Sequence, residues 1–153
     1  MSRITLLATL AGLIAWSANA GAQPPPPDPK SDLGRMQGKW YYNRVQEDGA
    51  ELELKGQTIL TVSGDKLKIE RAGGVVLAGT ITLEPKAKPR ALDLKLTSGE
   101  ASGKVIKGIY NYDGMTLQIV LGKPDGDRPI GFQTVRGDGN TAVTLKQAEP
   151  KKK

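Results

Sequence analysis

The chain has 153 residues, enough for one domain of ordinary size, and a formal net charge of +6. It contains no cysteine and no histidine, so Ser-His-Asp triads, Cys-His dyads and zinc sites built from these residues are excluded. Three of the basic residues form the tail Lys151 to Lys153, which leaves a nearly neutral domain without a basic nucleic-acid-binding face. We therefore expect no enzymatic activity, no cofactor and no nucleic-acid partner.

The N-terminal segment has the three parts of a secretory signal peptide. Met1 to Arg3 is short and positive, Ile4 to Trp16 is largely apolar, and A-x-A sequences end at Ala20 and Ala22. The alternative is a membrane anchor, but the apolar run is shorter than the roughly 20 residues that span a bilayer. We predict a signal peptide over 1–20, cleaved after Ala20 or Ala22. The protein is then exported, periplasmic or secreted, with no stable membrane insertion after cleavage.

A proline-rich linker follows over residues 21–31 and contains "QPPPPDP". Such a sequence favours an extended polyproline spacer and cannot pack a core. Ser31 and Asp32 then offer a helix N-cap, and Leu33 to Gln37 suits one short helical turn that ends at Gly38. The predicted domain therefore begins at the end of the linker.

From Lys39 onward, short segments of alternating polarity are separated by turn dipeptides such as Asp48-Gly49 and Gly64-Asp65. One face of each segment is apolar and the other is polar, which is typical of antiparallel sheets around a single core. We predict a single all-β domain over 32–147, followed by a basic tail over 148–153.

Gly79 and Gly108 occupy equivalent positions in two similar segments, "GVVLAGTITLE" and "GKVIKGIYNYD". Both lie on the inward side of their predicted strands. An inward glycine marks a bend or a place where a large neighbour packs, and a sheet that closes on itself needs such bends. The pair favours a barrel over a flat sandwich, and we expect Trp40 to pack near one of the two glycines.

The G-x-W triplet at Gly38 to Trp40 resembles the lipocalin and calycin pattern, in which the tryptophan plugs the closed end of an up-and-down barrel. Four stretches of the chain, in their order and spacing, together resemble the planctomycete-type lipocalin-like family of uncharacterised secreted proteins. They are "DLGRMQGKW", "EPKAKPRALDL", "GIYNYDGMTL" and "RPIGF". The resemblance covers about residues 32–147. It implies an antiparallel up-and-down lipocalin-like β-barrel of eight or nine strands, without an assigned activity.

A candidate pocket follows from the aromatic residues and one arginine. Arg44 shares the parity of Trp40 and Tyr42, so it is expected on the core side or at the barrel mouth. It either anchors an anionic head group or lies at the strand end and extends to water. The candidate ligand-binding residues are Trp40, Tyr42, Arg44, Tyr110, Tyr112 and Phe132.

Acidic residues also gather in "PDGDRP" over 124–129 and "GDGN" over 137–140. Calcium is one interpretation, but neither stretch has enough oxygen ligands, and turn formation accounts for both. Asp93 and Glu100 suggest a carboxylate pair, yet Asp93 lies on a polar face and is expected to be a solvated surface residue. We expect no metal site.

Two classes of function remain. The first is a carrier of a small apolar ligand in the barrel. The second is a structural or protein-interaction module with a filled core. The cavity volume separates them, because a pocket of ~300 Å³ or more holds a ligand whereas a filled barrel does not.

Overall fold

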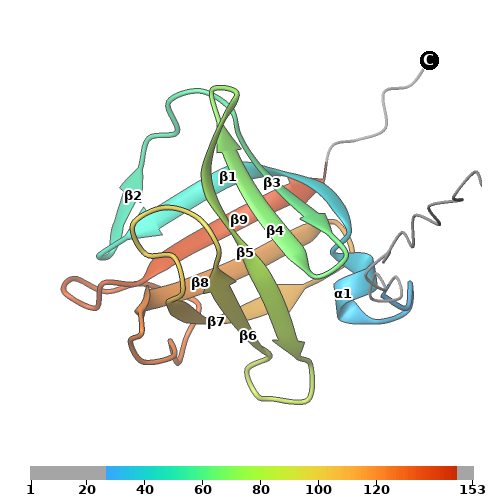
Figure 1. The fold of residues 1–153 in the computed structure, drawn as a ribbon. Coiled ribbons are helices and arrows are strands. Elements are labelled where there is room, and N and C mark those ends of the chain that lie inside the picture. Colours follow the sequence, from blue (N-terminus) through green and yellow to red (C-terminus); the bar gives the residue numbers. More distant parts are fainter. Residues whose placement is uncertain (1–26, 148–153) are drawn as a thin grey trace, which may run out of the picture.

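The structure is a computed structural model that describes residues 27–147 (Figure 1). The predicted signal peptide over 1–20, residues 21–26 of the predicted linker and the predicted tail over 148–153 lie outside the described residues.

One short helix, α1 (Asp32–Arg35), precedes the strands. Ser31 is its N-cap, and the Ser31 hydroxyl accepts a hydrogen bond from the Gly34 N–H at 3.0 Å. The predicted cap and helical turn are therefore confirmed. Gly38 then has a φ of +106°, a conformation that favours glycine and ends the turn. Between residues 27 and 147, no helix is long and apolar enough to cross a membrane.

Nine antiparallel strands form a single sheet. Their bounds are β1 (Gly38–Glu47), β2 (Ala50–Leu52), β3 (Thr58–Ser63), β4 (Lys66–Arg71), β5 (Gly74–Glu84), β6 (Ala91–Leu96), β7 (Val105–Tyr112), β8 (Thr116–Pro124) and β9 (Thr141–Gln147).

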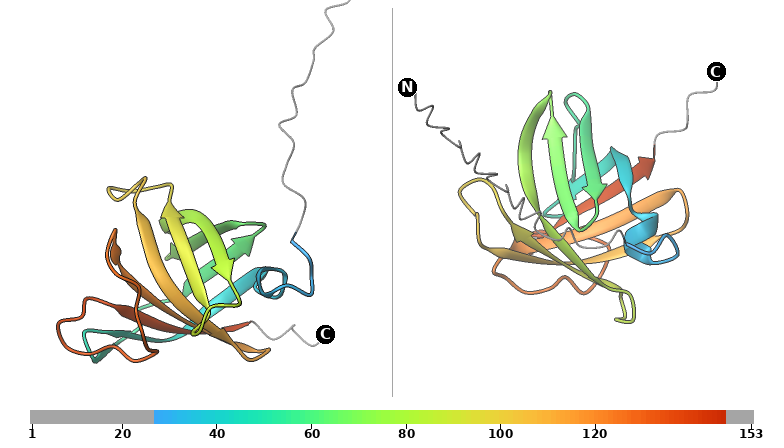
Figure 2. Two further views of the ribbon diagram at one scale, coloured as in Figure 1. Left: turned by 90° about the horizontal axis from the view of Figure 1, so that it is seen from below. Right: turned by 45° about the vertical axis from the view of Figure 1, so that its right-hand side comes forward.

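Eight of these strands close into an up-and-down barrel, because β1 pairs with β3 near its start and with β9 along most of its length. β2 pairs only with the second half of β1 and is an extra strand (Figure 1). The predicted antiparallel barrel of eight or nine strands is confirmed. α1 lies at one end of the barrel, and the long loop between β8 and β9 lies toward the other (Figure 2).

Apolar side chains from all eight barrel strands meet inside the barrel. In β3 the inward positions Leu60 and Val62 are buried, and in β4 the inward Leu67 and Ile69 are buried. Each such side chain contributes about 1.5–3 kcal/mol when it is fully removed from water. A chain without cysteine depends on this burial and on the sheet hydrogen bonds for its stability.

Gly79 and Gly108 mark places where adjacent strands approach too closely for a side chain. A Cβ at Gly79 would lie 2.5 Å from the Lys95 carbonyl oxygen, and one at Gly108 would lie 2.7 Å from the Val120 carbonyl oxygen. The packing of Trp40 at either glycine is not supported, because the closest side chains to both are leucines of adjacent strands.

Candidate functional site

A cavity of about 580 Å³ lies at the end of the barrel opposite α1, and we call it the cup. Its volume falls in the range of roughly 300–1,000 Å³ that is typical of small-molecule pockets. Apolar residues from the barrel strands form the wall, and exposed apolar residues from β2, the segment after it and β5 form the rim. The wall residues are Val45, Ile69, Leu77, Ile106, Leu121 and Val143, and the rim residues are Leu52, Leu54 and Val76.

Below the cup, the barrel is filled by its own side chains. A void of about 20 Å³ lies there among buried aliphatic residues, with Tyr42 in its wall. That is room for about one water molecule. Tyr42 lines both the void and the cup, so it marks the boundary between them. A ligand therefore has access only to the upper half of the barrel.

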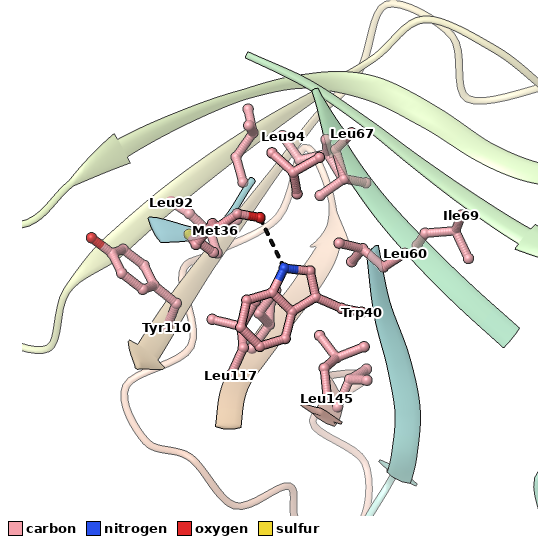
Figure 3. Packing of buried hydrophobic residues seen from close by; sticks show 14 of the residues in the cluster. Met36, Trp40, Leu60, Leu67, Ile69, Leu92, Leu94, Tyr110, Leu117 and Leu145 are labelled. Atoms are coloured by element: carbon pink, nitrogen blue, oxygen red, sulfur yellow. Dashed lines mark hydrogen bonds between the residues drawn. The ribbon is translucent and has the colours of Figure 1, made fainter. Parts of the chain in front are cut away.

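Trp40 lies at the closed end, as the G-x-W pattern predicts. Its side chain is fully buried, and its Nε1–H donates to the Met36 carbonyl oxygen at 2.8 Å (Figure 3). The Tyr112 ring meets the indole edge to face, with centroids 6.0 Å apart and an interplanar angle of 83°. This geometry is favourable for aromatic pairs and fixes both rings in the barrel floor.

Tyr110 belongs to the closed end as well. Its hydroxyl donates to Asp32 Oδ2 at 2.7 Å, and Arg90 Nη1 lies 3.4 Å from the same oxygen. Burial raises the pKa of Tyr110 well above its usual value, and the hydrogen bond to Asp32 raises this pKa further. Asp32 begins α1, so this contact attaches the helix to the barrel.

Arg44 does not point into the barrel. The pairing of β1 with β9 skips Asn43, and this bulge turns Arg44 outward and Val45 inward. Val45 is buried, whereas the exposed Arg44 donates from Nη2 to Glu51 Oε2 at 2.8 Å. The predicted inward direction of Arg44 is wrong, because the bulge breaks the alternation on which that prediction was based.

Phe132 lies in the loop between β8 and β9, on the outside of the barrel. With Arg44 and Gln118 it lines an outer hollow of about 500 Å³. The structure thus divides the six predicted residues among three places. Trp40, Tyr110 and Tyr112 lie at the closed end, Tyr42 lies at the base of the cup, and Arg44 and Phe132 lie outside.

Charged residues that the sequence analysis missed also line the cup. They are the cations Lys55, Arg71 and Lys123 and the acids Glu47 and Glu53. One signal for Arg71 was present, because the alternation that places Leu67 and Ile69 inside reaches Arg71 two residues later. No comparable signal marked the others, since they lie in loops or near strand ends.

The acidic loops form turns, as predicted. Asp138 accepts hydrogen bonds from the backbone N–H groups of Val135 at 2.8 Å and Asn140 at 2.9 Å, which lower the pKa of its carboxyl. Asp125 Oδ1 accepts from the Val105 N–H at 3.1 Å. In the part of the chain that the structure describes, no three acidic, histidine or cysteine side chains converge on a site for a metal ion.

Comparisons with models of protein families, with curated proteins and with solved structures found no match. The closed antiparallel barrel is consistent with a calycin-like fold. The architecture therefore agrees with the broader part of the resemblance found in the sequence.

Proposed function

We propose that the barrel binds one small apolar or lipid-like ligand in the cup. The observation that carries this proposal is the cavity of about 580 Å³, walled by aliphatic side chains and open at one end. Eight-stranded barrels are wide enough to hold one small ligand. The filled lower half limits the ligand to the upper half of the barrel.

Membership of the planctomycete-type lipocalin-like family is part of the proposal, and the closed barrel supports it. The proposal also includes export to the periplasm or the medium, and a role that involves no catalysis, no cofactor and no nucleic acid. The absence of histidine and cysteine from the sequence favours binding over catalysis.

A structural or protein-interaction module is the second candidate. The observation that favours it is the filled lower half, where the void measures about 20 Å³ and Trp40 is fully buried. In that case the cup is a solvent-filled depression, and binding of small apolar molecules is not expected.

Titration with the neutral fluorescent probe N-phenylnaphthylamine separates the two candidates. A carrier should bind the probe saturably, at one molecule per chain. Leu77 lines the cup from β5, so Leu77→Trp should narrow the cavity and weaken binding. Thr82 is exposed on the same strand, and Thr82→Trp is the matched control that should bind as the wild type does.

Weaker binding by Leu77→Trp alone would support the cup as the binding site. Equal binding by both variants would place the probe elsewhere and contradict the proposal. Absence of saturable binding to the wild type would leave the interaction module as the better explanation.

A further inference from the structure

Three polar side chains stand side by side on one wall of the cup, on the adjacent strands β1, β3 and β4. Thr58 and Arg71 are direct partners in the β3–β4 ladder. Trp40 pairs with Leu60, so two residues further along the antiparallel strands Tyr42 reaches the level of Thr58. Tyr42, Thr58 and Arg71 all line the cup. The row interrupts a wall that is otherwise mainly aliphatic.

Arg71 is held in place while most of its charge remains available. Its Nε donates to Thr58 Oγ1 at 3.4 Å, and Thr58 is itself buried. Within residues 27–147, no carboxylate oxygen lies within 4.0 Å of the Arg71 guanidinium, and its Nη groups form no hydrogen bond. Arg44 and Arg128 on the outer surface differ from Arg71, because both are paired with carboxylates.

Tyr42 supplies a second donor beside this cation. Burial raises its pKa to about 12, although the positive charge of Arg71 acts in the opposite direction. The phenol is therefore protonated at neutral pH and can donate a hydrogen bond. Among the described residues, its hydroxyl has no hydrogen-bond partner in the protein.

The charged residues of the cup, Arg71 included, leave an excess of one positive charge. Lys55 and Lys123 join Arg71, against Glu47 and Glu53. Glu47 accepts a hydrogen bond from Thr141 Oγ1 at 3.4 Å, which keeps it on the β9 side of the mouth. The field inside the cup thus favours an anion beside Arg71.

We infer that the ligand of the cup is an amphiphile with a single carboxylate, whose head group is bound by Arg71 and the Tyr42 hydroxyl. This inference rests on the proposed function, since it names the ligand class of the same cavity. A guanidinium binds a carboxylate through two parallel charge-assisted hydrogen bonds, and the phenol adds a third donor. The alkyl chain lies against the aliphatic wall formed by residues such as Ile69, Leu77 and Val143.

The test compares decanoate with decanol, which has the same chain length and no charge. The affinity of each compound for the full chain is measured by its displacement of N-phenylnaphthylamine. The wild type should prefer decanoate by roughly 10–100-fold, the equivalent of a charged hydrogen-bonded pair. Arg71→Met should abolish this preference, because the affinity for decanoate should fall to that for decanol measured in the same variant. Tyr42→Phe should lower the affinity for decanoate by roughly threefold to tenfold.

Two further variants make the assignment specific. Arg71→Lys keeps the charge without the planar fork and should retain part of the preference. Arg44→Met is the matched control, because Arg44 pairs with Glu51 outside the barrel, and it should retain the full preference. Binding of the probe by each variant shows that its barrel and cup are intact.

Equal binding of decanoate and decanol by the wild type would overturn this inference and leave the proposed function standing. A preference that persists in Arg71→Met would overturn the assignment to Arg71. If the wild type binds neither the probe nor either ligand, the proposed function fails and the inference fails with it.

Discussion

Tyr42 and Arg44 are two positions apart on β1, yet they lie on opposite sides of the barrel wall. The cause is the single unpaired residue Asn43, which shifts the register with β9. Regular alternation would place both side chains on one face. With the bulge, Tyr42 reaches the cup and Arg44 pairs with Glu51 on the outside. One residue therefore decides that Arg44 faces away from the cup.

The buried Tyr42 phenol should make the protein less stable in alkali. Its folded pKa of about 12 exceeds the ordinary value of 10.0, so the folded state holds the proton more tightly. The stabilisation is complete below pH 10 and is lost as the pH rises from 10 to about 12. Over this window, the free energy of unfolding should fall by roughly 2–3 kcal/mol more in the wild type than in Tyr42→Phe.

Urea unfolding followed by circular dichroism between pH 8 and pH 12 measures this difference. Tyr110 remains in both proteins, so any loss of unfolding free energy caused by its ionisation at high pH cancels in the comparison. Parallel pH profiles for the wild type and Tyr42→Phe would show that the Tyr42 phenol is solvated, contrary to the structure.

At the level of elements, one arginine attaches the long β8–β9 loop to the outside of β6 and β7. Arg128 Nη1 donates to the carbonyl oxygens of Leu92 at 2.9 Å and Gly108 at 2.7 Å. Its Nη2 donates to Asp93 Oδ1 at 2.7 Å. The alternation along the chain predicts a polar face for Asp93, whereas its partner Arg128 lies in a distant loop that no local pattern connects to it.

Arg128→Met should release the loop without opening the barrel. The change removes three hydrogen bonds, and we expect a loss of about 1–2 kcal/mol, because solvent screens the half-exposed ion pair. Limited proteolysis should cleave residues 125–140 faster than in the wild type.

Arg136→Met is the control, since Arg136 is exposed in the same loop and forms no ion pair with any residue in 27–147. Equal cleavage rates for the two variants would show that Arg128 does not hold the loop.

At the level of the whole molecule, closure of the barrel depends on places where strands approach closely. Gly108 on β7 is one of them, next to a register shift in the β7–β8 ladder. The Val120 carbonyl oxygen occupies the space that a side chain would need. Backbone atoms in a ladder cannot move aside without breaking its hydrogen bonds.

Gly108→Ala should therefore destabilise the barrel by about 1–3 kcal/mol or more, as overpacked cores do. Gly131→Ala is the matched control, because no atom lies within 4 Å of a Cβ there and its φ suits other residues. Denaturant unfolding of both variants measures the difference. Equal stability would mean that β7 and β8 separate at this point at little cost.

The features that the sequence determined by itself are local. Ser31 caps a helical turn, and the alternation along β3 and β4 places Leu60 and Ile69 inside. Short turns such as Gly64-Asp65 force consecutive strands to pair antiparallel. These signals depend on neighbours within a few residues, so the all-β class and the hairpin order follow from them.

Only the tertiary structure decided what lies across the strands. The β1–β9 pairing that closes the barrel joins residues about a hundred positions apart, such as Tyr42 and Leu145. The bulge at Asn43 and the alignment of Tyr42, Thr58 and Arg71 depend on the register between strands, which no short segment encodes. The position of the cup likewise depends on how far the core side chains fill the barrel, and this is a property of the assembled packing.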